Sequence, residues 1–342
     1  MAEKILVIRL SSIGDILHAS AVPRVLKKQF PLAEIHWLVR SDNLDLVGHN
    51  PHLSHVISYD RKTGFKGFRS LTEKLKTQNY THIYDAHSNL RSFYLCARIK
   101  APFFIRRHKP RFRRFALFWM RLNFFKNYNS VRSFTDPLKA WGVTDDGMGS
   151  ELHLPPSVTE KIQNLFSDFV RKNNLMGETK FIAFAPSAAW PKKRWPLEFW
   201  KSLARSLLDQ TQCGLAILGG PDDQFCHEIT QINPQRILHL QGRLTLLESA
   251  AATGFCTTLA ANDTGVLHMA EALGKNVVAL IGPTPFGYPT RAQSIALEVP
   301  LWCKPCSKDG SGPCVNPVYQ KCMLNIKPER VLGAVLEQYL RM

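Results

Sequence analysis

The sequence predicts an α/β protein of two doubly wound domains, each built on a parallel sheet, with a cleft between them. The length of 342 residues exceeds what one ordinary hydrophobic core holds and suits two domains of about 150 residues each. In both halves short apolar runs alternate with helix-like segments, which is typical of parallel sheets. A Pro155-Pro156 break separates the halves.

The first half, residues 1–155, contains three strand candidates with helix-like segments between them. The first candidate, KILVIRL, is rich in β-branched residues, ends in a Ser-Ser-Ile-Gly-Asp loop and leads into apolar residues at helical spacing. A further helix is expected around residues 71–76. The strand candidates are residues 4–10, 34–39 and 82–85.

The second half, residues 156–326, repeats this order after a helical stretch near residues 158–172. Each of its strand candidates is followed by a turn and a helix-like segment, so a second parallel sheet is expected. The closing residues 327–342 again carry apolar side chains at helical spacing. The strand candidates of this half are residues 181–185, 214–218, 257–261 and 277–281.

The composition is that of a folded globular protein, with 45% hydrophobic and 21% charged residues. The chain shows neither a signal peptide nor an apolar run long enough to cross a bilayer, so a cytoplasmic protein is expected. The net charge of +17 is uneven, because residues 1–155 hold 25 basic and 12 acidic side chains. The amino-terminal domain is therefore expected to meet nucleic acid, a membrane surface or a phosphorylated substrate.

The loop after the first strand carries Gly14, Asp15 and, one helical turn later, His18. Ligands of doubly wound sheets bind at such strand ends. The dipole of the following helix favours an ionised carboxylate at position 15, so Asp15 is either a functional group or a helix cap. The loop lacks the further glycines of a dinucleotide-binding fingerprint.

The loop at residues 262–268, Asn-Asp-Thr-Gly-Val-Leu-His, follows a strand and opens an apolar helix. Thr264 and Gly265 then present free backbone amides at a helix amino terminus, which is a favourable seat for a phosphate. The alternative is that Asp263 or Thr264 caps the helix and no ligand binds.

Other strand ends of the second half carry glycines, which let a ligand approach the backbone, and charged side chains. A cation there could neutralise a diphosphate, and a carboxylate could accept hydrogen bonds from a ribose. These residues are Ser187 and Lys193, Gly219-Gly220 with Asp222 and Asp223, and Gly282-Pro283-Thr284.

Taken together, these loops resemble glycosyltransferase family 9. The matching motifs are Gly14-Asp15-Ile-Leu-His18, Lys193-Arg-Trp-Pro, Gly219-Gly220, Asn262-Asp-Thr-Gly265 and Gly282-Pro-Thr. They occur in the family's order, and the chain looks like a heptosyltransferase that uses ADP-heptose. The resemblance implies a GT-B fold, with the acceptor in the amino-terminal domain and the nucleotide sugar in the other. It also implies that the closing helix, residues 327–342, packs back toward the amino-terminal domain.

By the resemblance, Asp15 is the catalytic base that takes the proton of the attacking acceptor hydroxyl. Lys193 and the amides beside Thr264 contact the diphosphate, and Asp263 holds sugar hydroxyls. Fixed amides and a lysine stabilise the leaving group without a divalent ion, and the chain has no Asp-x-Asp motif, so no catalytic cofactor is expected. The expected donor-binding residues are Ser187, Lys193, Asp222, Asp223, Asp263, Thr264, Gly265, Val266, His268 and Gly282.

Residues 91–132 contain twelve basic residues and no acidic one, interleaved with aromatic residues. Arginine matches phosphate groups and aromatic side chains suit a membrane interface. We expect this segment to meet a phosphorylated lipid A type acceptor and the anionic inner face of the inner membrane, on which the protein is peripheral. The alternative is a solvated basic helix whose aromatic residues enter the core. The expected acceptor-binding residues are Arg61, Lys62, Arg106, Arg107, Arg111, Arg113 and Arg114.

Four cysteines, Cys303, Cys306, Cys314 and Cys322, follow the pattern C-x2-C-x7-C-x7-C in a stretch rich in proline and glycine. Four thiolates can hold structural zinc or iron, and the spacing does not separate the two metals. Related autotransporter heptosyltransferases hold iron in a four-cysteine finger. The alternative is a set of reduced thiols.

The expected function is inverting transfer of heptose from ADP-heptose to a phosphorylated lipopolysaccharide inner core. Two alternatives keep the fold and donor loop, with either a protein acceptor or a different nucleotide sugar. The third is a nucleic-acid-binding protein with a four-cysteine metal site. Only Lys304, Lys308 and Lys321 lie among the cysteines, so no nucleic-acid partner is expected.

Overall fold

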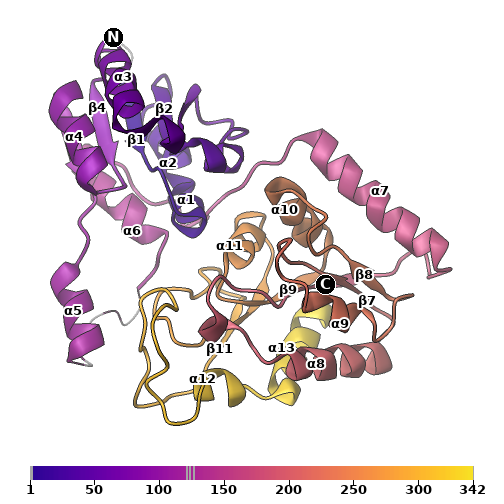
Figure 1. Cartoon of the computed structure of the whole chain (residues 1–342). Helices are drawn as coiled ribbons and strands as arrows, with labels where there is room; N and C mark the ends of the chain where they lie inside the picture. Colours follow the sequence, from indigo (N-terminus) through magenta and orange to yellow (C-terminus); the bar gives the residue numbers. More distant parts are fainter. Residues whose placement is uncertain (1–2, 121, 123–124, 126–127, 342) are drawn as a thin grey trace. The chain divides into compact units, whose positions relative to one another are not determined.

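The protein folds into two compact units, each with one parallel sheet (Figure 1). The computed structural model describes residues 3–341 apart from 121, 123–124 and 126–127. The first unit comprises residues 1–114 and 123–153, and the second comprises residues 115–122 and 154–342. The predicted fold class, two parallel-sheet α/β domains, is confirmed.

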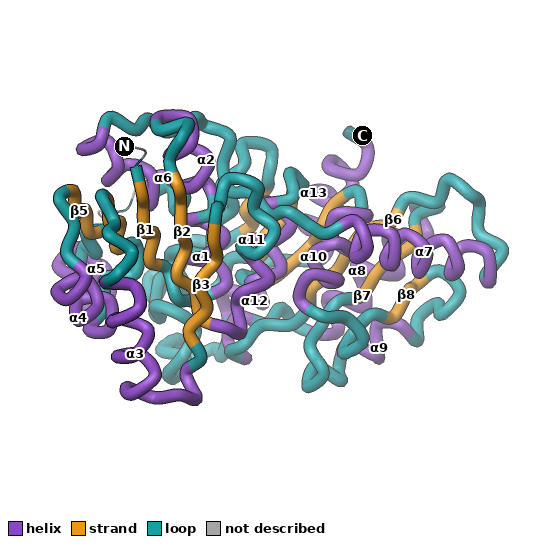
Figure 2. The backbone as a smooth tube through the Cα atoms, turned by 90° about the horizontal axis from the view of Figure 1, so that it is seen from above, coloured by secondary structure: helices purple, strands orange, loops and turns teal. Residues whose placement is uncertain are grey.

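The sheet of the first unit has five parallel strands in the order β3-β2-β1-β4-β5 (Figure 2). Its central strand β1 (Lys4–Ile8) pairs with β2 (Glu34–Arg40) on one side and with β4 (His82–Asp85) on the other. The switch point of this doubly wound sheet therefore lies between β1 and β4, and ligands bind at the carboxyl ends of such strands. Because both faces of β1 are buried after Lys4, residues 5–8 form an unbroken apolar run.

The strands β3 (His55–Tyr59) and β5 (Phe103–Arg106) form the two edges of this sheet, and the sequence did not predict them. Both are partly exposed and neither shows the buried apolar run of a central strand. The helices are α1 (Ile13–Ala19), α2 (Ala21–Gln29), α3 (Gly64–Lys76), α4 (Leu90–Ile99), α5 (Arg111–Trp119) and α6 (Arg132–Thr135). Short 3-10 helices cover Ser41–Leu46, Arg61–Thr63 and Asp136–Trp141.

The sheet of the second unit has six parallel strands in the order β11-β10-β9-β6-β7-β8, with its switch point between β6 and β9. The four predicted strands are present as β6 (Phe181–Ala185), β7 (Gly214–Ile217), β9 (Thr258–Asn262) and β10 (Val277–Leu280). The strands β8 (Ile237–His239) and β11 (Ile295–Leu297) are three-residue edges that were not predicted.

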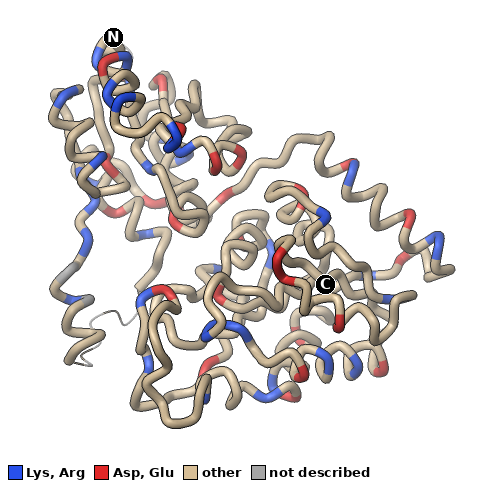
Figure 3. Tube along the Cα trace, in the orientation of Figure 1, with Lys and Arg blue, Asp and Glu red and all other residues tan. Residues whose placement is uncertain are grey.

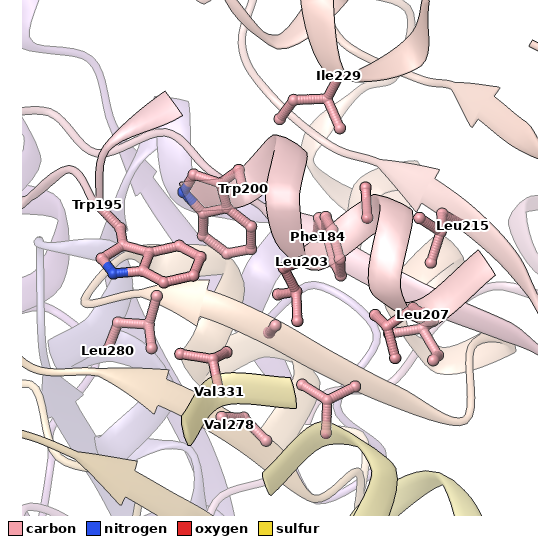
Figure 4. Close-up of a cluster of buried hydrophobic side chains, with 14 of the residues drawn as sticks. Phe184, Trp195, Trp200, Leu203, Leu207, Leu215, Ile229, Val278, Leu280 and Val331 are labelled. Atoms are coloured by element: carbon pink, nitrogen blue, oxygen red, sulfur yellow. The ribbon is translucent and has the colours of Figure 1, made fainter. Parts of the chain in front are cut away.

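Helices cover both faces of this second sheet. Side chains alternate along β6, so Ile182 and Phe184 enter one hydrophobic layer while Phe181 and Ala183 enter the other. Figure 4 shows part of the first layer, in which Trp195 and Trp200 meet edge to face with ring centroids 5.1 Å apart. The helices are α7 (Pro156–Lys172), α8 (Leu197–Gln210), α9 (Cys226–Thr230), α10 (Leu246–Phe255), α11 (Gly265–Ala272), α12 (Lys321–Leu324) and α13 (Pro328–Leu340).

The closing helix α13 buries its apolar face within the second unit. Val331, Ala334 and Val335 belong to the same hydrophobic layer as Trp200, and α13 packs against α8, β9 and β10. The expected packing toward the amino-terminal domain stays a prediction. The spacing of apolar residues shows that one helix face is buried but not which surface covers it. Among the described residues, no helix is long and apolar enough to span a membrane.

Candidate active site

Asp15 lies in the first turn of α1, directly after β1 and beside the switch point of the first sheet. The N-cap residue of α1 is Ser12, so Asp15 is not the cap. The Asp15 carboxylate forms an ion pair with Arg9 and accepts a hydrogen bond from Ser12 Oγ at 3.3 Å, and 43% of its side chain is exposed. Burial raises the pKa of Asp15, but Arg9 and His18 lower it by more, so the carboxylate is ionised at neutral pH.

Arg9, which holds Asp15, was not predicted as a site residue. Its side chain is buried, its Nη1 donates to the carbonyl oxygen of Ala86 at 2.9 Å, and its guanidinium lies 5.3 Å from the centre of the Phe134 ring. Because Ala86 follows β4, Arg9 ties the loops on the two sides of the switch point together. Its position directly after a buried apolar strand was the available sequence signal.

The loop after β4 adds a buried, neutral histidine. Asp85 accepts hydrogen bonds from Ser88 N at 2.8 Å and from Ser92 Oγ at 2.9 Å, which fixes this loop. Burial and the nearby Arg9 together lower the pKa of His87 to about 4, although Asp15 interacts with the same ring and opposes this shift. His87 was also missed, although it follows a predicted strand just as Asp15 does.

The residues predicted to bind the acceptor lie in several places of the first unit. Arg61 and Lys62 are exposed on the 3-10 helix that follows β3. Arg106 Nε lies 2.7 Å from Asp85 Oδ2, and the buried Arg107 donates from Nε to a backbone carbonyl oxygen at 3.0 Å. These two arginines therefore have partners inside the unit. Arg111 and Arg114 lie on α5, and their side chains lie outside the described part of the chain.

A cavity of about 600 Å³ opens beside the amino-terminal end of α5. Two predicted acceptor residues, Arg107 and Arg113, line it together with His108 and Tyr128. The segment from α4 to α6 carries no acidic residue, and the lysines and arginines in its described part are coloured blue in Figure 3. The lining also includes Asp136, so the cavity offers an anionic group two arginines and one carboxylate.

In the second unit, the loop after β6 and the end of β9 bring an ion pair together. Lys193 Nζ lies 2.7 Å from Asp263 Oδ2, and Thr284 Oγ1 donates to the same oxygen at 2.6 Å. Burial raises the pKa of Asp263, but Lys193 and His268 lower it by more, so this carboxylate is ionised. Two predicted donor residues, Lys193 and Asp263, thus meet at the carboxyl edge of the sheet.

The helix α11 begins directly after Asp263. Thr264 is its N-cap residue, with φ −142° and ψ 170°, but the Thr264 side chain makes no capping hydrogen bond. The first amides of a helix have no partner within the helix. Gly265 and Val266 therefore offer N–H groups at the positive end of the helix dipole, which suits phosphate oxygens.

Two glycines allow the chain to close tightly on the Lys193–Asp263 ion pair. A Cβ atom on Gly287 would lie 2.0 Å from Asp263 Cγ. Gly310 has φ +103°, and a Cβ atom there would lie 2.7 Å from Lys193 Cδ. Any side chain at these positions would displace the pair.

The remaining predicted donor residues lie on neighbouring loops. Asp223 Oδ2 accepts from Gly220 N at 2.8 Å and so stabilises the glycine turn, whereas Asp222 is exposed. Ser187 is half-buried after β6. Gly282 packs on α12, because a Cβ atom there would lie 2.6 Å from a methionine sulfur. A ribose contact by Asp222 or Asp223 stays a prediction.

Two supporting residues were missed. Asn262 donates to the carbonyl oxygen of Pro186 at 2.7 Å and accepts from Trp195 N at 3.1 Å, so it joins β9 to the loop after β6. The buried Lys192 donates to the carbonyl oxygens of Ser311 and Pro313 at 2.9 and 3.0 Å. Two adjacent lysines look alike in sequence, so nothing separated this structural role from that of Lys193.

The four clustered cysteines lie on and beside the irregular loop that Lys192 holds, and none of them is in a disulfide. Burial raises the pKa of Cys322 to about 11, and the nearby Cys306 and Cys314 contribute to the rise. Cys303 Sγ accepts from an asparagine side chain at 3.4 Å. Within the described ranges, no three of these sulfur atoms lie within 4.8 Å of one another. A metal at the cysteines stays a prediction.

Curated relatives of this chain are heptosyltransferases. The lipopolysaccharide core heptosyltransferase OpsX of Haemophilus influenzae is 25% identical over 81% of this chain and 78% of its own length. The lipooligosaccharide heptosyltransferase 2 of Haemophilus ducreyi is 23% identical over 96% of this chain and 97% of its own length.

Solved structures show the same two-domain fold. A glycosyltransferase family 9 protein of Veillonella parvula superposes with a TM-score of 0.81 at 23% identity, covering 100% of this chain and 98% of its own. The E. coli ADP-heptose lps heptosyltransferase II gives a TM-score of 0.73 at 21% identity and covers 99% of both chains. The iron-containing glycosyltransferase TibC of E. coli gives 0.59 at 11% identity, covering 99% of this chain and 77% of its own. These likenesses confirm the GT-B architecture.

The family match covers most of the chain and both units. Residues 68–313 match the model of Glycosyltransferase family 9 (heptosyltransferase). This stretch runs from α3 of the first unit to the cysteine-containing loop of the second, and it includes the Lys193–Asp263 ion pair. The chain therefore belongs to glycosyltransferase family 9.

Proposed function

We propose that this chain transfers heptose from ADP-heptose, with inversion, to a phosphorylated lipopolysaccharide inner-core acceptor. The observation that carries the proposal is that each switch point holds one part of the required chemistry. The first unit holds the ionised Asp15, and the second holds Lys193 beside the free amides of α11. Support for the donor comes from the solved E. coli heptosyltransferase WaaC, which has been determined with ADP and with an ADP-heptose analogue.

In the proposed reaction, Asp15 takes the proton of the acceptor hydroxyl while that oxygen attacks the anomeric carbon of heptose. The bond between this carbon and the diphosphate oxygen breaks, and ADP leaves with the negative charge. The amides of Gly265 and Val266 and the Lys193 ammonium stabilise this charge. Asp263 accepts hydrogen bonds from sugar hydroxyls once Lys193 turns to the diphosphate. No divalent ion takes part in this step.

We propose that the acceptor phosphates bind in the cavity beside α5. Arg107, His108 and Arg113 supply cations or hydrogen-bond donors there. Anionic lipids attract the acid-free segment around this cavity. The protein then works as a peripheral protein at the cytoplasmic face of the inner membrane, where a lipid-linked acceptor is accessible.

We propose further that the four clustered cysteines hold a structural zinc or iron ion. The thiolate donor set suits either metal, and Cys306, Cys314 and Cys322 lie close enough together to interact electrostatically. The neighbour TibC is named as iron-containing. An ion there stabilises the loop whose Gly310 packs on Lys193.

The Asp15→Asn variant tests the base. Turnover with ADP-heptose and a lipid A type acceptor should fall by about 10²-fold or more, while the ADP affinity measured by calorimetry stays within about twofold because the donor residues lie in the other unit. Asp42→Asn, which changes an exposed carboxylate of the same unit, is the control and should keep its turnover. Unchanged turnover in Asp15→Asn excludes Asp15 as the base. Product from a UDP- or GDP-sugar but not from ADP-heptose contradicts the proposed donor.

A further inference from the structure

Glu34, His36 and His55 gather at the amino ends of the strands of the first sheet. Glu34 and His36 are the first and third residues of β2, so their side chains leave the same face of the sheet. His55 begins the edge strand β3 and is the direct ladder partner of His36. Since all strands are parallel, this edge is opposite the strand ends that carry Asp15. The proposed transfer reaction makes no use of the cluster.

The three side chains present their ligand atoms to one another. Glu34 Oε1 lies 2.7 Å from His36 Nε2 and 3.7 Å from His55 Nε2. All three ligand atoms lie within 4.8 Å of one another, and theirs is the one such group in the part of the chain that the structure describes. Ligands on a tetrahedral zinc ion, bound at about 2.0–2.2 Å, are about 3.4 Å apart, so small side-chain rotations bring the three atoms onto one ion.

Neighbouring groups orient the ligands. His36 Nδ1 lies 2.8 Å from the Tyr80 hydroxyl, which turns Nε2 toward Glu34. Histidines that bind metals almost always hydrogen-bond through their other ring nitrogen in this way. Lys4 Nζ lies 3.5 Å from Glu34 Oε2, which leaves Oε1 for the ion. The His55 side chain is 66% exposed, so this side of the cluster is open to solvent.

We propose that Glu34 Oε1, His36 Nε2 and His55 Nε2 bind a divalent transition-metal ion of the zinc type. Two imidazoles and one carboxylate suit such an ion better than Mg²⁺ or Ca²⁺, which prefer all-oxygen sites. The ion links the edge strand β3 to β2 and so stabilises the first unit. The alternative is that the same side chains form only a hydrogen-bond network and bind no metal. The test must distinguish metal binding from this alternative.

The test compares zinc binding by untagged full-length protein after removal of metals with a chelator. In calorimetric titration the wild type should bind one equivalent of Zn²⁺ more than His55→Ala and more than Glu34→Gln. His55 is exposed, so its loss leaves the core intact. His49→Ala removes an exposed histidine of the same unit and should keep the wild-type stoichiometry. Zn²⁺ should also raise the unfolding temperature of His49→Ala more than that of His55→Ala.

The cysteines contribute equally to all of these proteins, because they lie in the second unit. With Co²⁺ as the probe, sulfur-to-metal charge-transfer bands report any thiolate-bound ion and should be the same in wild type and His55→Ala. Tyr80→Phe should weaken the additional site about tenfold or more. Equal stoichiometry and affinity in wild type and His55→Ala, or equal losses in His55→Ala and His49→Ala, would overturn the proposal.

Discussion

At the level of single residues, the Lys193–Asp263 ion pair stabilises the fold, and under the proposed function its lysine also binds the donor diphosphate. A buried carboxylate is costly unless it is paired, and here Lys193 and Thr284 pair it. Under the proposed function, a diphosphate competes with Asp263 for the same ammonium group. Lys193 therefore has two partners in turn, and its removal affects both.

Removing this cation by Lys193→Ala should weaken ADP binding. A hydrogen bond to a charged group contributes about 1.5–3 kcal/mol, so the dissociation constant should rise about tenfold or more by calorimetry. Lys180→Ala, which removes an exposed lysine of the same unit, is the control and should bind ADP as the wild type does. Equal affinities in the two variants would remove Lys193 from the diphosphate site.

The same variant has a second readout in acid. The pKa of Asp263 is depressed in the folded protein, so its contribution to stability is present above the unfolded value of about 3.9 and is lost as the pH falls through the folded value. Without Lys193, burial raises the pKa of Asp263. In Lys193→Ala the unpaired carboxylate therefore costs stability at neutral pH, and protonation relieves this cost. The deficit in unfolding temperature of Lys193→Ala relative to wild type should shrink as the pH falls, whereas Lys180→Ala should follow the wild type.

Sequence motifs identified candidate site residues at strand ends, but they did not identify the neighbouring residues that contact and orient them. Asp15, Lys193 and Asp263 occur in recognisable motifs, and the structure shows an ion pair between Lys193 and Asp263 that the motifs did not predict. Arg9 and His87 stand outside any motif, and their role depends on the pairing of β1 with β4, which brings loops about 77 residues apart in sequence together. Such a pairing is a property of the sheet and is not visible in a local pattern.

At the scale of elements, central strands were predictable and edge strands were not. A strand such as β6 is buried on both faces and reads as an apolar run, whereas β8 and β11 have three residues each and β3 and β5 are partly exposed. An edge strand pairs on one side only, so its sequence need not be apolar. These four edge strands were therefore not predicted from the sequence.

The cysteine-containing loop adjoins one member of the Lys193–Asp263 ion pair. Lys192 and Gly310 attach it to the segment that carries Lys193.

If the cysteines hold a metal, the double variant Cys306→Ser/Cys314→Ser should lose about one equivalent of zinc or iron by elemental analysis of untagged protein. Its unfolding temperature and ADP affinity should fall with the metal.

The matched control for this loop is Cys96→Ala, because Cys96 is a buried cysteine of the first unit. It should keep the wild-type metal content even where it lowers stability through a small cavity. Wild-type protein free of any thiolate-bound ion, or a double variant that retains it, would leave the cysteines as reduced thiols.

For the whole molecule, the uneven charge distribution acts on an anionic partner at longer range than any other property discussed above. Of the net +17, residues 1–155 hold most, with 25 basic against 12 acidic side chains. This asymmetry was evident from composition, since it needs no knowledge of the fold. The packing of α13 was not, because an apolar helix face is compatible with either unit until the core is known.

Binding to anionic membranes should depend on the acid-free segment of the first unit. Arg91, Arg113 and Arg132 are exposed there, and each basic residue near an anionic surface contributes about 1 kcal/mol. The triple change of these residues to Glu should abolish sedimentation with phosphatidylglycerol vesicles. Wild-type binding should weaken as salt rises from 0.05 to 0.5 M, because charges more than about 8 Å apart are already screened near 0.15 M.

The control for this prediction is an equal charge reversal in the second unit, at Lys172, Lys180 and Arg205, which should leave most membrane binding intact. If both triple variants lose binding equally, net charge alone drives association and the segment has no special role.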